Sequence, residues 1–276
     1  MDMFEAGMED DSGFHVFNAG PNHYHRTEAF ERTGAVDITC AIEKVTHGAL
    51  SPTGDYATLM VMQWFFQPKN SHRISEATIE LLFEAESDQT EIEVKGVSFP
   101  GTYSLMKTSQ DESVTVGTEA TIGVEQVGKL SSTGKWEKTT SATTSDAITL
   151  SGGKRLVKNT PPYRIAKWTI SENQSQPTGI PASLKVAVLV SRDTEEKFRC
   201  KINFDCKTDW RTKFANVFKK IPKNDPIVFQ PDPEDRGKRP NANVSYGDEK
   251  LGSINLDDLS QVTYRTVISD GEKVWR

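Results

Sequence analysis

Alternation of apolar and polar side chains over one long segment constrains the fold of this chain more than any other feature. From Val114 to Val124 every second residue is apolar or small, and the residues between them are Gly, Thr and Glu. This period of two indicates a β-strand with one buried and one solvated face. After a turn at 126–129, nine of the fifteen residues from Ser131 to Ser145 are Ser or Thr. Because most strands have ~5–6 residues, the two arms predict an unusually long antiparallel hairpin and an all-β fold.

Further strands follow from the same pattern elsewhere in the chain. Apolar and polar residues alternate over 36–43, 78–84 and 198–205, and every second residue of 184–190 is Leu or Val. The charged residues 192–196 predict a hairpin loop between the last two strands, 184–190 and 198–205. The segment 58–66 is apolar on both faces, which predicts a central strand covered on each side. At Gly96 the apolar phase slips by one residue, which predicts a β-bulge.

One segment has helical rather than strand spacing. Trp210, Phe214 and Phe218 recur at intervals of four, which predicts a short amphipathic helix near residues 209–220. We therefore expect an antiparallel β-sandwich or distorted barrel with long strands and one short amphipathic helix. Residues 1–33 are expected to be an irregular N-terminal segment, and residues 34–276 a single all-β domain.

Composition excludes several classes of partner. The formal net charge of −6 argues against nucleic acid and against an electrostatic membrane anchor, both of which need basic patches. The first residues lack the basic and apolar regions of a signal peptide, and no run approaches the ~20 apolar residues of a spanning helix. The three cysteines, Cys40, Cys200 and Cys206, are expected to be free. These observations predict a cytoplasmic protein that binds neither nucleic acid nor membrane.

Five residues are candidates for a functional site. His23 and His25 could place two imidazoles on one face of a strand, as in half of a zinc or copper site, but the other ligands are unspecified and we predict no metal. Gln63 interrupts an apolar run beside Trp64, and a buried amide must be hydrogen-bonded. Gln63 either bonds to a neighbouring backbone group or lines a ligand pocket with Trp64 and Trp168. No familiar phosphate-binding, dinucleotide-binding or nucleophile motif is present, and no cofactor is expected.

Several segments resemble an uncharacterised family of proteins from filamentous fungi. The resemblance covers roughly residues 70–270, and its most specific parts are 112–115, 135–139, 144–147, 167–173, 179–181, 186–190, 225–229 and 251–252. It implies no activity, because none is assigned to the family as a whole.

The long hairpin also resembles the extended β-domain of aerolysin-type pore-forming proteins. Those proteins likewise carry an alternating strand, a turn and a return arm rich in Ser and Thr, here Val114–Val124 and Ser131–Ser145. In such a hairpin one face meets lipid and the other a water-filled lumen. The return arm departs from this pattern, because Lys138 and Asp146 would face lipid. We therefore do not expect the hairpin to insert into a membrane.

Two functions remain open from the sequence. The first is an intracellular β-sandwich that binds a small apolar molecule or a protein partner, with an aerolysin-like long hairpin. The alternative is a cofactor-independent cyclase or isomerase that acts on an apolar fungal secondary metabolite beside Gln63, Trp64 and Trp168. An enclosed pocket with converging polar groups would favour the enzyme. The sequence specifies neither the ligand nor the oligomeric state.

Overall fold

The computed structural model describes residues 16–20, 23–34, 36–69, 72–87, 90–105, 137–138, 147–208, 224–232, 242–264, 267–269 and 272–274. The predicted helix near 209–220 lies outside these residues. So do both arms of the predicted long hairpin, except for β7 (Glu137–Lys138), which pairs with Tyr103 and Ser104 of β6 (Gly101–Leu105).

The first sheet is built around two long neighbouring strands, Val36–Ala49 and Tyr56–Pro68. Its order is β1 (Glu28–Arg32), β2 (Val36–Ala49), β3 (Tyr56–Pro68), β10 (Ser183–Arg192) and β14 (Gln261–Thr263). Two more strands attach beside this path: β13 (Val244–Asp248) runs parallel to β2, and β5 (Ile92–Val97) runs antiparallel to β10. β1 falls within the segment 1–33 that was expected to be irregular.

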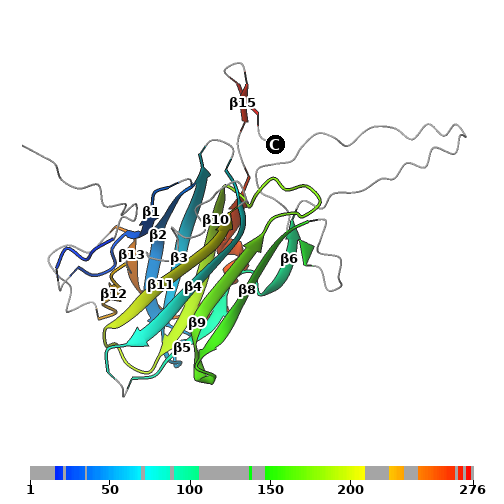
Figure 1. The fold of residues 1–276 in the computed structure, drawn as a ribbon. Helices are drawn as coiled ribbons and strands as arrows, with labels where there is room; N and C mark the ends of the chain where they lie inside the picture. Colours follow the sequence, from blue (N-terminus) through cyan, green and yellow to red (C-terminus); the bar gives the residue numbers. More distant parts are fainter. Residues whose placement is uncertain are drawn as a thin grey trace, which may run out of the picture.

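The second sheet covers one face of the first. Its order is β12 (Ile227–Phe229), β11 (Phe198–Thr208), β4 (Ile74–Ala85), β9 (Thr160–Ser171), β8 (Ile148–Val157), β6 and β7. Figure 1 shows β11, β4, β9 and β8 as one layer in front of β2, β3 and β10. The two sheets are not closed into a barrel, so the all-β sandwich is confirmed over the barrel alternative. A separate pair, β15 (Val267–Ser269) and β16 (Glu272–Val274), completes the described strands.

The core lies between the two sheets and is rich in aromatic rings. Trp64 stacks on Phe204 with ring centroids 5.6 Å apart, and Phe198 stacks on Phe229 at 4.8 Å. β3 is buried on both faces from Ala57 to Trp64, which confirms the prediction for 58–64, whereas Phe65 is exposed. Its second face packs against Leu251 and neighbours in two short 3₁₀ segments, η3 (Leu251–Ser253) and η4 (Leu256–Leu259). The predicted bulge is also confirmed, since the pairing of β5 with β10 slips between Val94 and Gly96.

The segment 192–196 is not a hairpin loop. β10 belongs to the first sheet and β11 to the second, so this charged segment carries the chain from one layer to the other. Alternation along a strand shows which of its faces is buried, but it does not show which sheet the strand joins. Whether two consecutive strands pair with each other depends on the other strands of the sheet. The hairpin prediction was therefore wrong.

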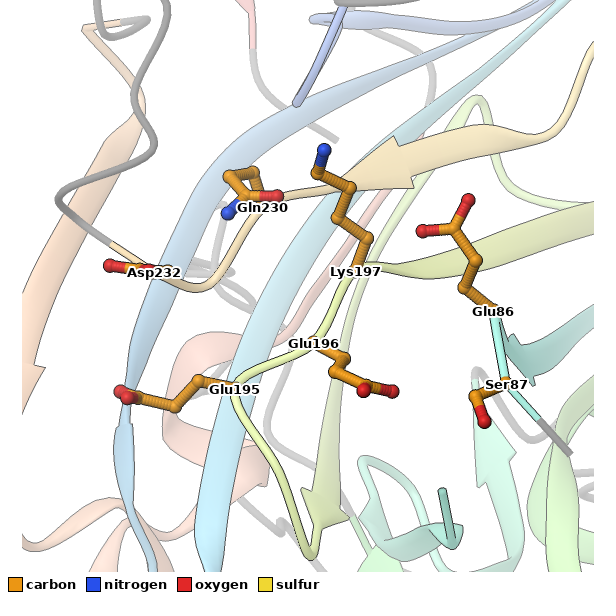
Figure 2. A pocket seen from close by; sticks show the side chains of 7 residues that line it. All are labelled: Glu86, Ser87, Glu195, Glu196, Lys197, Gln230 and Asp232. Atoms are coloured by element: carbon orange, nitrogen blue, oxygen red, sulfur yellow. The ribbon is translucent and has the colours of Figure 1, made fainter. Parts of the chain in front are cut away.

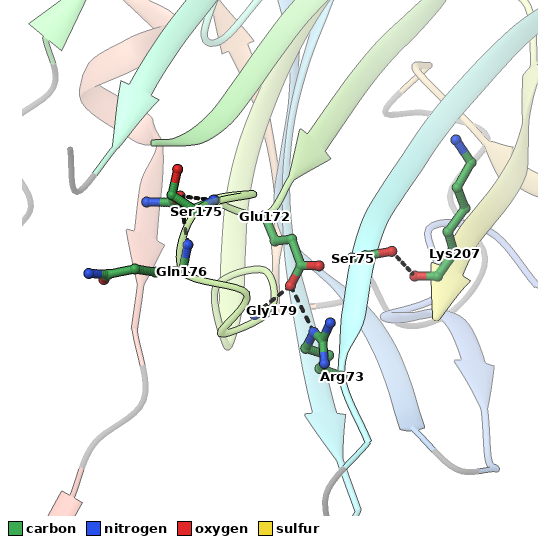
Figure 3. A network of polar contacts seen from close by, with 8 residues as sticks. Arg73, Ser75, Glu172, Ser175, Gln176, Gly179 and Lys207 are labelled. Carbon is green, nitrogen blue, oxygen red and sulfur yellow. Dashed lines mark hydrogen bonds and ion pairs between the residues drawn. The ribbon is translucent and has the colours of Figure 1, made fainter. Parts of the chain in front are cut away.

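Polar contacts fix the connection between β9 and β10. Glu172 accepts hydrogen bonds through Oε2 from Arg73 Nε at 3.0 Å and from the amide of Gly179 at 2.9 Å. Asn173 Oδ1 accepts from the amides of Ser175 and Gln176 in the same turn. Figure 3 shows this network at the start of β4. It satisfies backbone groups of the loop, which also donates to β4 through the amides of Glu172 and Ile180.

Asp257 of η4 holds the start of β6 and the residue Phe99 before it in place. Its Oδ1 accepts from the amide of Phe99 at 2.6 Å, and its Oδ2 accepts from the Tyr103 hydroxyl at 3.1 Å. Phe99 has a φ of 54°, a left-handed conformation that needs support from its surroundings.

Asp257→Ala should therefore destabilise the protein by about 2 kcal/mol, because both donors lose a charged acceptor. Urea unfolding measures this change. Asp258→Ala is the matched control, since Asp258 is the exposed neighbour in the same segment, and we expect it to change stability by less than about 0.5 kcal/mol. Equal losses in the two variants would contradict the role given to Asp257.

Candidate functional site

Strand register brings polar residues together at one end of the second sheet. Ala85, Phe198 and Phe229 lie side by side on β4, β11 and β12. The residues one step beyond this row are Glu86, Lys197 and Gln230, and all three line a cavity of about 520 Å³. The other described residues of its wall are Ser87, Glu195, Glu196 and Asp232. We call this the acidic cavity (Figure 2).

Among the residues that the structure describes, the acidic cavity carries four carboxylates and one ammonium group. Figure 2 shows Glu195 and Asp232 on one side of it and Glu196, Glu86 and Ser87 on the other. Glu86 is in an ion pair with Arg199 at 3.3 Å, and Glu196 Oε2 accepts from the Thr90 hydroxyl at 2.6 Å. Within the described part of the chain, the Glu195 carboxylate makes no hydrogen bond or ion pair. The cavity therefore has a negative wall that is only partly neutralised.

Lys197 is held at the back of this wall by an aromatic ring. Its Nζ lies 5.2 Å from the centroid of the Tyr24 ring, a cation–π arrangement. Tyr24 is itself fixed, since it forms a parallel bridge with Val228 of β12. This contact directs the ammonium group toward the N-terminal segment.

Gln230 is the one buried amide in the wall of the acidic cavity, and its side chain is incompletely bonded. It is 4% exposed, and its Oε1 has no hydrogen-bond partner among the described residues. Its backbone is held on both sides: the amide donates to His25 Nε2 at 3.1 Å, and the carbonyl accepts from the Tyr246 hydroxyl at 3.3 Å. A buried acceptor without a partner costs ~1–3 kcal/mol of folding free energy. The side chain of Gln230 therefore destabilises this wall until a donor reaches its Oε1.

Two buried histidines lie directly behind Gln230. His25 Nε2 is 2.9 Å from His47 Nε2, and His47 Nδ1 is 2.8 Å from the Thr58 hydroxyl, with His47 and Thr58 opposite each other on β2 and β3. A backbone N–H can only donate, so His25 Nε2 accepts from Gln230 and carries no proton. His47 Nε2–H must then donate to His25, and His47 Nδ1 accepts from Thr58. Both imidazoles are neutral in this chain of hydrogen bonds.

Burial keeps the two histidines neutral. It lowers the pKa of His25 from 6.5 to about 4. It also lowers the pKa of His47 well below its ordinary value, and the nearby charges of His25 and Arg192 act in the same direction. Arg192 is itself buried, which lowers its pKa to about 10, while Glu195 opposes this change. The interior behind the acidic cavity therefore disfavours any added positive charge.

A second cavity adjoins the first through Ser87. Its volume is about 680 Å³, and its wall includes Glu84, Glu91 and Arg164 as well as Pro161 and Pro162. Glu84 is in an ion pair with Lys201. The wall of this second cavity is more polar than apolar and includes charges of both signs.

The structure separates the residues that the sequence singled out. Trp64 and Trp168 are fully buried in the core. Gln63 Nε2 donates to the backbone carbonyl of Trp64 at 3.2 Å, so of the two alternatives for Gln63 the structure shows the bond to a neighbouring backbone group. None of these three lines either cavity. His23 Nδ1 accepts from the amide of Ala19 at 3.0 Å, whereas His25 points into the core toward His47. Only His25 contacts the wall of the acidic cavity.

The sequence reasoning missed the residues that form this site. Gln230 follows a three-residue strand and precedes a Pro-rich stretch, so nothing around it suggested burial. Glu195 and Glu196 were interpreted as a solvated hairpin loop. His47 could have been found, because it shares the buried parity of Val45 within a long strand, and a histidine at such a position needs a polar partner.

Comparison with known proteins and screening of the described residues give no further assignment. Among the described residues, no group of three or more His, Cys, Asp or Glu side chains is placed to hold a metal ion. In that same part of the chain, no helix is both long and apolar enough to cross a membrane. The chain matches no family model, no curated protein and no solved structure.

Proposed function

We propose that this protein is a binding protein whose acidic cavity takes a small organic cation that carries N–H donors, such as an alkyl ammonium or a guanidinium group. Four carboxylates against one ammonium favour positive charge in the cavity. The ammonium of Lys197 is occupied with the Tyr24 ring. The carboxylate of Glu195 makes no hydrogen bond or ion pair among the described residues, and it supplies acceptors for such a ligand.

Gln230 is the single observation that carries this proposal. Its Oε1 is a buried acceptor that no described residue satisfies, in the wall of a cavity that is otherwise rich in acceptors. The terminal torsion of a glutamine turns easily, so this oxygen can turn toward a donor in the cavity. A ligand with N–H groups would satisfy it, and an anion or an uncharged acceptor would not.

The size and layout of the cavity favour a small ligand with two cationic ends. About 520 Å³ lies within the range of ~300–1,000 Å³ typical of small-molecule sites. Carboxylates stand on two sides of the cavity (Figure 2). A short linear diamine presents one ammonium group to each side, and this is the ligand class we propose.

This proposal changes the ligand that the sequence led us to expect. An apolar ligand would place hydrocarbon against charged groups, which costs free energy because they would lose water. The enzymatic alternative rested on a pocket beside Gln63, Trp64 and Trp168, and the contacts of these residues within the core do not favour it. The aerolysin-like hairpin lies outside the described residues and supports neither function.

Titration calorimetry with the dication diaminobutane tests the proposal, and butanediol of the same length is the uncharged control ligand. We expect diaminobutane to bind and butanediol not to bind. Glu195→Gln combined with Asp232→Asn should weaken binding by about tenfold or more, since each charge-assisted hydrogen bond contributes roughly 1.5–3 kcal/mol. Gln230→Leu should weaken it by about fivefold, because it removes a neutral acceptor.

Glu80→Gln is the matched control variant. Glu80 is also a half-exposed carboxylate of the second sheet, but it pairs with Lys167 away from the cavity. We expect it to bind diaminobutane as the unaltered protein does. Equal weakening by Glu80→Gln, or equal binding of butanediol, would show that the cavity does not recognise the cation.

A further inference from the structure

We infer that His25 makes ligand binding in the acidic cavity sensitive to pH: when its Nε2 gains a proton, Gln230 is released from its position and the cavity loses its ligand. This inference rests on the proposed binding of a cation. It concerns the regulation of the site, and its basis is a continuous chain of hydrogen bonds from the interior to the cavity wall.

The geometry at His25 Nε2 admits only a neutral ring. This nitrogen faces two donors, the Gln230 amide at 3.1 Å and the His47 Nε2–H at 2.9 Å. A proton on Nε2 would turn an acceptor into a third donor at the same point. The hydrogen bond from the Gln230 amide would then be lost, because a backbone N–H cannot accept, and the ring would repel this amide. His47 can adapt to a proton on Nδ1 because the Thr58 hydroxyl can rotate and accept, so His25 is the sensitive member of the pair.

The surrounding groups do not compensate a charge on His25. From its own segment come Tyr24 and Arg26, and the guanidinium of Arg26 donates to Asn18 Oδ1 and to the carbonyl of Asp225. The other elements that pack on the histidine pair contribute aromatic or cationic side chains: His47, Arg192, Phe198, Phe229 and Tyr246. Burial lowers the pKa of His25, and no carboxylate among the described residues is a cause of this shift.

Release of Gln230 is the response that costs least. The strand before it, β12, has three residues and forms the edge of its sheet. Val228 of this strand is held by the amide of His25 at 2.8 Å, and Gln230 is held by the His25 ring. A charged His25 that turns toward solvent therefore takes away contacts from the cavity wall. The carboxylate Asp232 follows two residues later and moves with it.

Hydrogen exchange at the Gln230 amide reports this opening directly. His25 has a pKa of about 4 in the closed protein and 6.5 in solvent. The equilibrium constant for opening should therefore rise about 30-fold between roughly pH 7.5 and pH 5, after correction for the intrinsic pH dependence of exchange. In His25→Gln the amide oxygen replaces Nε2 as an acceptor that does not titrate, and the rise should disappear.

The affinity for diaminobutane is measured over the same pH range in the same two proteins. As the pH falls, we expect the unaltered protein to lose affinity more steeply than His25→Gln, which lacks the titrating ring. His72→Gln is the control, because His72 follows the end of β3, whereas Thr58 lies near its start. It should behave like the unaltered protein.

The outcomes separate this inference from the proposed function. Absence of diaminobutane binding at pH 7.5 would refute both the proposed function and the inference that rests on it. If diaminobutane binds but its affinity has the same pH profile in His25→Gln and in the unaltered protein, the inference alone is refuted. If His25→Gln does not fold, the unaltered protein still decides the matter. Protection of the Gln230 amide that is independent of pH, or a pKa of His25 that saturating diaminobutane does not lower, overturns the inference.

Discussion

Acidification from about pH 7 to pH 4 should destabilise this protein by about 3 kcal/mol through His25 alone, since one pKa unit corresponds to ~1.4 kcal/mol and burial lowers this pKa from 6.5 to about 4. The unfolded chain binds a proton at His25 below pH 6.5, whereas the folded chain does not until the pH approaches 4. Stability is therefore fully present above this window, falls through it as the pH decreases, and loses nothing more from His25 below it. His47 acts in the same direction.

Urea unfolding at the two ends of this pH range measures the effect. Carboxylates that are paired in the folded state also contribute to acid instability. The contribution of His25 is therefore measured by comparing variants with the unaltered protein. His25→Gln should lose less stability than the unaltered protein over the range, and His72→Gln should lose the same amount. If His25→Gln and the unaltered protein lose equal stability on acidification, the histidine pair is not the acid-sensitive element.

Truncation of Trp168 should cause the other large effect. Its side chain is fully buried, and its indole Nε1 donates to the carbonyl of Ser98 at 2.9 Å. Trp168→Ala should cost ~3–5 kcal/mol, from the lost apolar burial and the cavity left behind. Trp64 is equally buried between Phe30 and Phe204, but its Nε1 has no partner among the described residues.

A matched pair of milder substitutions isolates the hydrogen bond. Trp64→Phe removes an unpartnered donor, whereas Trp168→Phe breaks a buried hydrogen bond and leaves the Ser98 carbonyl without it. Trp168→Phe should therefore be the more destabilising of the two by about 1–2 kcal/mol in thermal or urea unfolding. If Trp64→Phe proves more destabilising, the polar contact is not what distinguishes these two residues.

Strand pattern made much of the described fold predictable. A period of two predicted the half-buried strands over 36–43, 78–84 and 198–205. The apolar run 58–64 on β3 and the slip at Gly96 also report local geometry that the chain itself encodes. The crossing from β10 to β11 was not predictable, because it depends on which sheet each strand joins. That choice is made by contacts far apart in the sequence, such as those of Phe198 with Ala85 and Phe229.

The candidate site was less predictable for a related reason. Its residues come from three separated segments, and only the register of β4, β11 and β12 brings Glu86, Lys197 and Gln230 to one edge. Trp64 and Trp168 drew attention because large aromatic residues are common in ligand pockets, but they are more often core residues. His25 was singled out beside His23, whereas its partner in space is His47, from another strand.

The central claim is that the acidic cavity recognises a cation through Gln230 and the carboxylates around it. A titration with diaminobutane, followed in the amide spectrum of the isotope-labelled protein, tests it most directly. We predict that the largest changes fall on the side-chain amide of Gln230 and on the backbone amides of Glu195, Glu196 and Lys197. Changes that are absent, or that instead follow the half-exposed carboxylates Glu76, Glu80 and Glu84 along β4, would contradict the claim.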